Sequence, residues 1–539
     1  MVTDLREVLI ENEFGLTERS QGSARDCDAD SLPFDDVAPD ASSMIESMRA
    51  HGYTLATAVA DLVDNSIAAG CKNVWLRFEW EGDDSWISIV DDGKGMTEQG
   101  LVNAMRLGSR SPLESRDAAD LGRFGLGLKT ASFSQARRLT VASRQAGVTA
   151  LRRWDLDHLA RPDVSGWQLL RSAHPETGDR IEVLDELSPG HGTQVLLEVL
   201  DRVTGVEDPG ATQEVREDHF IRQINTVRDH VGMVFHRFLE KKRGGLRIHL
   251  NDTAVEPWDP FLESHKATQA MGDYSQKLGA HPMPVRVKGF VMPHRDKFAG
   301  FDEHKDGGGP GGWNAHQGFY LYRNERLIIA GDWLQLGWQQ EEHFKLARIR
   351  LDISNAMDSE WQIDVKKSTA APPAVLRSWL KGIAKDVRAR AKEVYSHRGR
   401  YGTRKKKGPG QSTPWVGVTK KSGEFGYRIE RKHAVLSALI KSLSSRKSEK
   451  LEALLRLVEE TVPVQKIWID SAENQDGAAE PFAGEKSRSL RELILLCHKA
   501  LTEHAGVSSS ASWDEIAHSD GFQGNEAQAI VQQLREASD

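Results

Sequence analysis

The chain has 539 residues, of which 39% are hydrophobic and 28% are charged, and its formal net charge is −8. This length exceeds what one core usually serves, so we expect two or three globular domains. The chain lacks an apolar run of about 18 residues, which argues against a membrane span. It also lacks signal-peptide order, and its three distant cysteines fit a reducing cytoplasm rather than a disulfide scaffold or a Cys-type zinc site.

The charge is unevenly distributed along the chain. Residues 1–40 hold eleven acidic and three basic residues, a net charge of −8, and predict an acidic leader over 1–41. Residues 396–432 hold eleven basic and two acidic residues, a net charge of +9. A basic segment in an acidic protein indicates a polyanionic partner.

Residues 42–205 predict an α+β sandwich, with helices on one face of a mixed sheet. Ala58, Leu62 and Asn65 recur at helical spacing and Gly70 can end a helix, so 42–70 predicts one or two helices. Apolar alternation and turn signals predict six strands, which span residues 73–80, 85–93, 137–145, 148–156, 180–187 and 192–200.

Residues 206–396 predict a second α/β domain. Its expected helices span 215–242 and 372–397, and its expected strands span 246–255, 284–292, 318–329 and 348–354. The Gly-rich stretch 306–314 predicts a mobile loop. A basic linker over 397–415 then leads to a mainly helical region, 416–539, whose role the sequence does not indicate.

The first of three polar motifs contains Asp61, Asp64, Asn65 and Ser66. Asp61 and Asn65 are four residues apart, so they share one helix face and can meet one ligand. The Asn65 carbonyl is a hard ligand that suits Mg²⁺. The alternative is that these acidic residues only cap or solvate a helix.

The second motif begins with Asp91, directly after an apolar strand, so its carboxylate emerges at a strand end. Gly93 and Gly95 let the backbone turn and approach a ligand without a Cβ clash, and Met96 can pack against it. In isolation, an ordinary turn would be the better explanation of these residues.

The third motif is a glycine-rich stretch that can gather backbone N–H groups around phosphate oxygens, with a helix starting behind it. Its candidate residues are Gly122, Arg123, Phe124, Gly125, Leu126, Gly127, Lys129 and Thr130. Lys129 adds a mobile cation, and the polar stretch 108–122 is typical of a lid. Leu128 interrupts a Walker A pattern and no strand clearly leads into Gly122, so we reject a P-loop.

The ordered set of motifs resembles the GHKL ATPase superfamily of gyrase B, MutL, MORC proteins, the ninety-kilodalton heat-shock chaperone and histidine kinases. The resemblance implies a Bergerat-type ATPase domain that uses ATP and Mg²⁺. It assigns Asp91 to the adenine amino group and Thr193 to the support of Asp91. Asp61 stands where the family typically has a glutamate that activates water, and the shorter side chain predicts slow hydrolysis.

The stretch 322–328 resembles the transducer domain of MutL and MORC proteins, which has a ribosomal-protein-like fold. In MutL- and gyrase-like members a transducer lysine reaches the γ-phosphate, and Lys366 and Lys367 are the candidates here. Neighbours in a strand point to opposite faces, so only one lysine can do this, and we predict Lys367. The alternative is a solvated pair at a strand end.

The basic linker predicts nucleic-acid binding without base specificity, because its side chains can neutralise phosphates. The candidates are Arg398, Arg400, Arg404, Lys405, Lys406 and Lys407, with Tyr401 as one possible stacking ring. The alternative is an extended, solvated tether.

These features predict a Mg²⁺-dependent ATPase that becomes a homodimer on binding ATP and acts on DNA or with a partner nuclease or helicase. Prokaryotic MORC-like proteins commonly occur in restriction-like or anti-phage gene clusters, so the resemblance also implies such a role. A protein-remodelling chaperone is the alternative. A histidine kinase is disfavoured, because the first histidine, His51, already lies at the edge of the nucleotide domain.

Overall fold

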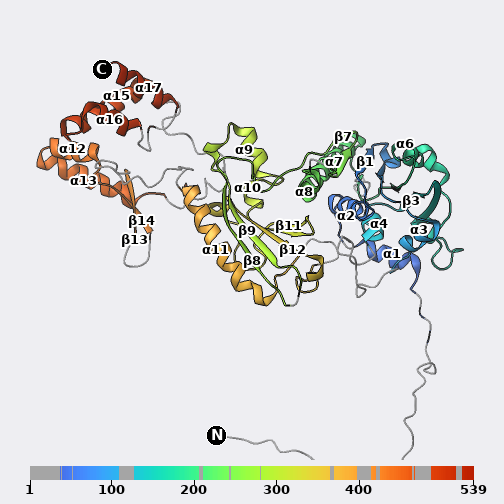
Figure 1. Ribbon diagram of the computed structural model, residues 1–539. Helices are drawn as coiled ribbons and strands as arrows, with labels where there is room; N and C mark the ends of the chain where they lie inside the picture. The colour runs from blue at the N-terminus through green and yellow to red at the C-terminus, as the bar shows by residue number, and fades with distance from the viewer. Residues whose placement is uncertain are drawn as a thin grey trace, which may run out of the picture. The chain divides into compact units, whose positions relative to one another are not determined.

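We describe the fold from a computed structural model of the chain, drawn in Figure 1. Its described residues are 35, 37, 39–50, 52–108, 127–204, 210–241, 244–279, 281–363, 369–396, 414–419, 425–463, 466–467, 487–504, 506–517, 522 and 525–538. The chain divides into two compact units. The first holds the described residues up to 227 together with 247–254, and the second holds 228–246 and the residues from 255 onward.

The first unit is built on a seven-stranded sheet in the order β4-β3-β5-β2-β1-β6-β7. All of its pairs are antiparallel except β1 with β6. The strands are β1 (Asn73–Glu79), β2 (Trp86–Asp91), β3 (Arg138–Gln145), β4 (Val148–Asp155), β5 (Gly192–Glu198), β6 (Arg247–Leu250) and β7 (Thr253–Ala254). The helices are α1 (Ala41–Arg49), α2 (Leu55–Ala68), α3 (Glu98–Met105), α4 (Gly127–Phe133), α5 (Leu156–Leu159) and α6 (Val183–Leu187), with the 3-10 segments η2 (Gly82–Asp84) and η3 (Pro175–Ile181).

Helix α2 covers one face of this sheet. Thr54 caps the helix and forms a reciprocal capping box with Thr57. The helix buries a nearly continuous set of side chains from Leu55 to Asp64. Ser66 near its end reaches Asp91 at the end of β2, so helix and strand are joined where the first two motifs meet.

The opposite face of the sheet is also covered, which corrects two predictions. Residues 180–187 were expected to form a strand, but they belong to η3 and α6. Val183 and Leu184 pack against Val90 and Ala142 on that face. Helical structure therefore covers both faces of the sheet rather than one.

The strands predicted at 246–255 are present as β6 and β7, but they complete the first sheet instead of the second domain. Asn73 of β1 pairs with Arg247 of β6 in a parallel register. Helix α7 (Gln213–Val234) precedes them as predicted and is followed by α8 (His236–Leu239).

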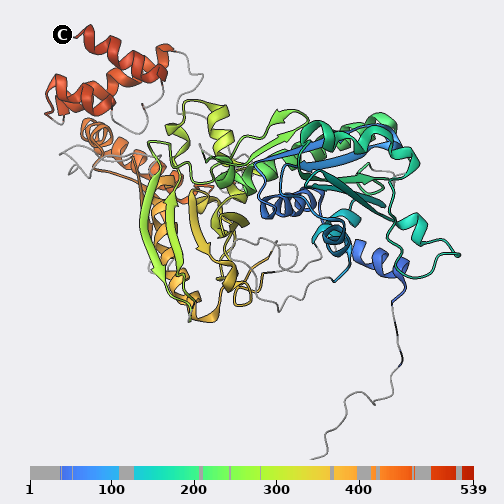
Figure 2. The same cartoon turned by 45° about the vertical axis from the view of Figure 1, so that its right-hand side comes forward.

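The second unit contains a five-stranded sheet in the order β11-β10-β12-β9-β8. Its strands are β8 (Gln269–Gln276), β9 (Val285–Val291), β10 (Gly318–Arg323), β11 (Arg326–Asp332) and β12 (Ala347–Ile353). Helix α11 (Ala374–Ser396) lies along these strands (Figure 2). Gly289 allows this close approach, since a Cβ there would lie 2.5 Å from Val387 Cγ2. Three short 3-10 segments, η4 (Arg295–Lys297), η5 (Glu342–Phe344) and η6 (Asn355–Met357), connect the elements.

The Gly-rich stretch 306–314 was predicted to be a mobile loop, and this prediction is wrong. It contributes to helices α9 (Phe301–Gly308) and α10 (Gly312–Ala315). The fully buried Arg348 donates to the carbonyls of Gly307 and Gly308 and lies over the Trp313 ring. Because glycines have no side chain, their backbone carbonyls are accessible to the buried guanidinium of Arg348.

The last part of the chain is mainly helical, as predicted, and also contains a hairpin that was not expected. Its elements are β13 (Trp415–Thr419), β14 (Phe425–Ile429), α12 (Ala434–Ser442), α13 (Ser445–Glu460), α15 (Ser487–Lys499), the π-helical η7 (Ala500–His504), α16 (Ser509–Ala517) and α17 (Asn525–Glu536). Leu490, Ile494 and Trp513 lie in the core of the last helices. The α+β fold class is confirmed. None of the helices in the described residues is long and apolar enough to cross a bilayer.

Candidate functional site

Asp91 is a buried carboxylate at the end of β2, with 6% of its surface exposed. Ser66 Oγ of α2 donates to Oδ2 at 3.0 Å, and Gly93 N donates to Oδ1 at 2.8 Å. Burial raises the pKa of Asp91 to about 6, although these hydrogen bonds lower it. In the part of the chain that the structure describes, no basic side chain forms an ion pair with this carboxylate.

A chain of hydroxyl groups lies beside Asp91. Thr193 pairs with Asp91 across β2 and β5, and its Oγ1 lies 2.8 Å from Ser143 Oγ of β3. Ser143 Oγ in turn accepts a hydrogen bond from Met96 N at 2.9 Å. The second motif is thus fixed to the middle of the sheet by buried polar contacts.

Two glycines of this motif are required by the protein's own packing. Gly95 has a φ of +65°, and a Cβ there would lie 1.8 Å from the Arg144 carbonyl oxygen. At Gly93 a Cβ would lie 2.7 Å from the Ala69 Cβ and 2.8 Å from Asp91 Oδ1. A side chain at either position would displace the loop that holds Asp91.

The first motif presents one buried and one exposed group on helix α2. Asp61 is 4% exposed, and Tyr53 Oη donates to its Oδ2 at 3.1 Å. Asn65, one turn later, is exposed at the end of the helix. Asp61 lies inside α2, so it neither caps nor solvates the helix, and Asp64 is buried as well.

Gly127 and Lys129 place the start of α4 against α2 and α3. A Cβ at Gly127 would lie 3.9 Å from Asp61 Oδ2. Lys129 is buried, and its Nζ donates to the carbonyl of Ala104 in α3 at 2.9 Å. Burial lowers the pKa of Lys129 to about 8. Lys129 was expected to be a mobile cation, and its buried position contradicts that expectation. Thr130, next in α4, is buried too.

Several predicted site residues lie outside the described residues. They are Gly122, Arg123, Phe124, Gly125, Leu126, Lys366, Lys367, Arg398, Arg400, Arg404, Lys405, Lys406 and Lys407. Just before the two candidate lysines, Trp361 and Gln362 form a turn.

The sequence analysis missed three residues that position this site: Tyr53, Ser143 and His191. The His191 ring accompanies Gly93, with Nδ1 2.9 Å from the Gly93 carbonyl oxygen. Ser66 belongs to the first motif, but the sequence predicted no role for it. In the structure its hydroxyl donates to Asp91. Strand alternation puts Ser143 on the same face as other buried residues of β3, which is a signal for a buried hydroxyl. No local pattern links Tyr53 to Asp61.

Part of the chain that contains this site matches a known family. The family described as "Histidine kinase-, DNA gyrase B-, and HSP90-like ATPase" matches residues 53–193. ATPase morc-1 of Caenorhabditis elegans is 29% identical over 96 residues, which are 18% of this chain and 11% of that protein.

Two DNA mismatch repair proteins MutL are also similar. The one from Paramagnetospirillum magneticum is 34% identical over 134 residues, and the one from Rhodospirillum rubrum is 31% identical over 131 residues. Each match covers 24% of this chain and 20% of the relative. The matched segment therefore spans a fifth or less of the length of these relatives.

Proposed function

Because residues 53–193 belong to the GHKL ATPase family and the chain is MORC- and MutL-like, we propose that this protein binds and hydrolyses ATP at Asp61, Asn65 and Asp91. The observation that carries the proposal is the buried Asp91 carboxylate. It is held by Ser66 and Gly93 and has no ion-pair partner among the described side chains. A buried carboxylate with a raised pKa and no cation beside it is a candidate for a ligand-binding group.

Adenine recognition follows from the chemistry of Asp91. An ionised carboxylate only accepts hydrogen bonds, so it selects a ligand that donates, such as the exocyclic amino group of adenine. The hydroxyl groups of Thr193 and Ser143 hold the surrounding strands in register. Met96 is fixed through its backbone N–H and stays half-buried, in a position to line the base.

Hydrolysis is proposed for the α2 side of the site. Asp61 is the candidate base that orients water, and the Tyr53 hydroxyl positions its carboxylate. The exposed amide oxygen of Asn65 suits Mg²⁺, which would neutralise phosphate charge. The glycine-rich motif, Gly122 to Thr130, is proposed to cover the phosphates, and Lys367 in preference to Lys366 is proposed to contact the γ-phosphate.

We place the ATPase in a DNA-related process, as an ATP-gated dimer. The printed names of the MutL relatives, which are DNA mismatch repair proteins, support this proposal. The net charge of +9 over residues 396–432 supports a nucleic-acid contact through the linker, for example beside a partner nuclease or helicase. Defence against phage is a further proposal. A protein-remodelling chaperone is the second candidate, because the family description includes HSP90-like ATPases.

ATP binding and turnover of the full chain test the proposal. Wild type is expected to bind ATP with Mg²⁺ and hydrolyse it slowly, and a nucleotide analogue that resists hydrolysis should convert monomer to dimer. Asn65→Ala should lose Mg-nucleotide binding, whereas Asp61→Ala should bind ATP without hydrolysing it. Asp163→Asn is the control, because Asp163 lies at the surface and pairs with Arg161. Equal turnover in wild type and Asp61→Ala would remove Asp61 as the base.

A further inference from the structure

A second cluster of metal-ligand type lies in the second unit, in residues that the ATPase site does not use. His236 begins α8, Glu240 follows one turn later, and Asp259 lies in the segment before β8. One ligand atom from each residue lies within 4.8 Å of the other two. His236 is 3% exposed, so the cluster has a fixed, buried base.

The separations fit ligands around one ion. His236 Nδ1 lies 3.1 Å from Glu240 Oε1. Two ligands bonded at about 2.0–2.2 Å to one tetrahedral ion lie a little over 3 Å apart. Asp259 completes the set after a shift of its side chain. We propose that His236 Nδ1, Glu240 and Asp259 form a binding site for one divalent transition-metal ion such as Zn²⁺.

The groups behind these ligands support this assignment. Tyr322 Oη lies 2.8 Å from His236 Nε2, so this ring nitrogen already has a hydrogen-bond partner. Because the Tyr322 hydroxyl bonds Nε2 of His236, the other ring nitrogen, Nδ1, is left to bind the ion. Metal-bound histidines typically have such a hydrogen-bond partner on the nitrogen that does not bind the metal. The Asp259 carboxylate accepts from Phe261 N at 2.9 Å and from Glu263 N at 2.7 Å, one bond to each oxygen, so each oxygen keeps a lone pair for the ion once the side chain shifts toward it.

The surrounding charge also favours a cation. Glu240 and Asp259 supply two negative charges. The nearby Arg237 is neutralised by an ion pair with Asp352. The buried Arg348 interacts electrostatically with Asp259 and offsets part of this negative charge, while its guanidinium donates to backbone carbonyls and lies over the Trp258 ring. Imidazole with two carboxylates selects transition metals over Mg²⁺, which prefers oxygen ligands alone.

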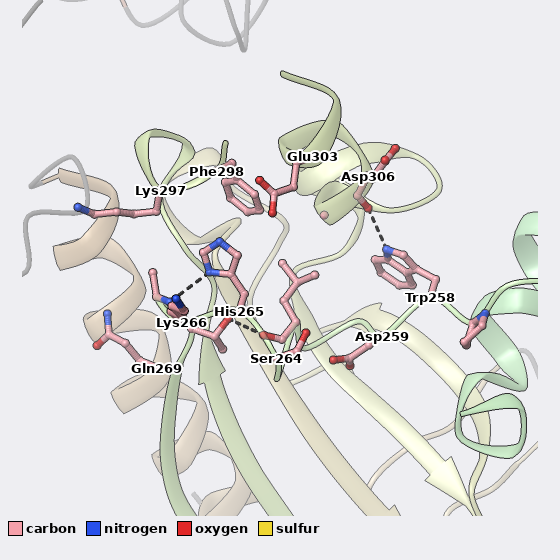
Figure 3. A pocket seen from close by; sticks show the side chains of 15 residues that line it. Trp258, Asp259, Ser264, His265, Lys266, Gln269, Lys297, Phe298, Glu303 and Asp306 are labelled. Atoms are coloured by element: carbon pink, nitrogen blue, oxygen red, sulfur yellow. Dashed lines mark hydrogen bonds between the residues drawn. The ribbon is translucent and has the colours of Figure 1, made fainter. Parts of the chain in front are cut away.

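The proposed site borders a cavity through Asp259, one of its three ligands. Asp259 lines a cavity of about 1010 Å³, together with Trp258, His265, Phe298 and Glu303 (Figure 3). Three protein ligands and a position that faces a cavity are typical of a site that exchanges water or a small anion. The ion would join α8 to the segment that carries Asp259.

Metal titration of the full chain without nucleotide tests the site. After treatment with a chelator, wild type is expected to bind Zn²⁺ with one more equivalent than Glu240→Gln, or at least about tenfold more tightly. Co²⁺ should give a visible absorption band of a four-coordinate site in wild type. Asp259→Asn should show the same loss, and Zn²⁺ should raise the Tm of wild type only.

Glu263→Gln is the matched control. Glu263 is an exposed neighbour that bonds Arg350 and keeps its backbone N–H on Asp259. Glu240→Gln is the decisive variant, because Glu240 is 42% exposed and glutamine can still accept from His236, so folding is preserved. Equal stoichiometry and affinity in wild type, Glu240→Gln and Glu263→Gln would overturn the site, as would the absence of Zn²⁺ binding in wild type.

Discussion

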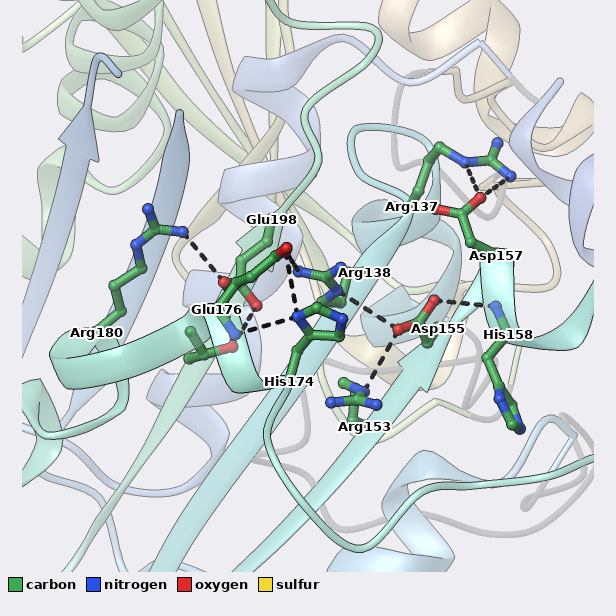
Figure 4. Close-up of polar contacts among 11 residues, drawn as sticks. Arg137, Arg138, Arg153, Asp155, Asp157, His158, His174, Glu176, Arg180 and Glu198 are labelled. Carbon is green, nitrogen blue, oxygen red and sulfur yellow. Dashed lines mark hydrogen bonds and ion pairs between the residues drawn. The ribbon is translucent and has the colours of Figure 1, made fainter. Parts of the chain in front are cut away.

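The two faces of the first sheet bury charge in opposite ways. On the face away from α2, Glu198 accepts hydrogen bonds from Thr177 and Arg180, and Arg138 and Arg153 approach Asp155 (Figure 4). On the α2 face, Asp91 is held by a hydroxyl and backbone N–H groups. The first face pairs its carboxylates with arginines, although Arg138 Nε and Arg153 Nε are buried without hydrogen bonds. On the second face Asp91 has no cationic partner among the described residues, and we propose that this charge serves a ligand.

The presence or absence of an ion-pair partner distinguishes a structural carboxylate from a proposed ligand-binding one better than burial does. Glu198 is 2% exposed and Asp91 is 6% exposed, so exposure alone would rank them together. The paired face closes over its charges with η3, which carries Arg180 and Thr177. The Asp91 carboxylate is bonded by Ser66, which follows the exposed Asn65 in helix α2. Changes on the two faces should therefore affect different properties.

The largest effect is expected on the paired face, and it should be an effect on stability. Glu198→Ala removes the acceptor for Thr177 and leaves Arg180 with one partner fewer, so the free energy of unfolding should fall by about 3 kcal/mol. Denaturant unfolding measures this. Glu176→Ala is the control, because Glu176 is exposed and its ion pair with Arg138 is 3.7 Å long, so the loss should be small. A weaker ATP affinity in folded Glu198→Ala would contradict the assignment of separate roles to the two faces of the sheet.

On the ligand face, Asp91→Asn should weaken ATP binding by about 100-fold, or about 3 kcal/mol, because it removes a charged acceptor. Its fold should survive. The new carboxamide can accept from Gly93 N and donate to Ser66 Oγ, which can turn its own hydrogen toward the Leu62 carbonyl. Calorimetric titration with ATP measures the affinity, with Asp163→Asn as the control. An unchanged affinity would contradict the assignment of Asp91.

The same substitution should stabilise the protein without nucleotide at pH 8. The pKa of Asp91 is raised in the folded state, so the folded chain holds this proton more tightly than the unfolded chain. That contribution is full below the unfolded pKa of about 4 and is lost as pH rises through about 6. Two pKa units correspond to up to about 3 kcal/mol, which Asp91→Asn should recover at pH 8 but not at pH 4. A lower Tm at pH 8 would contradict this.

ATP affinity should fall as pH drops below about 6, since protonation removes the charge that accepts the amino group. If only the ionised form binds, affinity falls about tenfold per unit below this pKa. The phosphates of ATP titrate in the same range, so Asp91→Asn serves as the reference. The pH dependence of ATP affinity in Asp91→Asn contains only the effect of the phosphates. Parallel profiles in wild type and variant would exclude Asp91 as the titrating group.

The smallest effect is expected at Tyr53. Tyr53→Phe removes the hydroxyl that positions Asp61, so kcat should fall about fivefold, near 1 kcal/mol, while ATP affinity stays the same. Single-turnover hydrolysis, together with separate binding measurements, distinguishes an effect on kcat from an effect on ATP affinity. A change in affinity without a change in kcat would assign Tyr53 to nucleotide binding rather than to Asp61.

Local sequence patterns were enough to predict the elements around the site. Features that depend on contacts between distant parts of the chain could not be predicted. The strand ending at Asp91 and the helix carrying Asp61 and Asn65 follow from periodicity within short windows. The parallel pairing of Asn73 with Arg247 crosses more than 170 positions, and no local pattern reports it. Residues 180–187 have apolar positions that fit strand and helix alike, and packing on Val90 decides for a helix.

Site chemistry shows the same division. Residue types and order predicted Asp61, Asn65 and Asp91, but burial could not be predicted for Lys129, whose partner Ala104 lies in another helix. The 306–314 stretch was misread because its glycines pack around Arg348, a residue of a distant strand. The contact between Tyr53 and Asp61 depends on the bend that starts α2, so sequence spacing does not reveal it.

The most direct test of the central claim compares ATP with inosine triphosphate, which carries an oxygen in place of the adenine amino group. Wild type at pH 8 should bind ATP at least about tenfold more tightly than inosine triphosphate, because the Asp91 carboxylate needs a donor. Asp91→Asn should lose this preference. Equal affinities of wild type for the two nucleotides, or a preference that survives in Asp91→Asn, would contradict this claim.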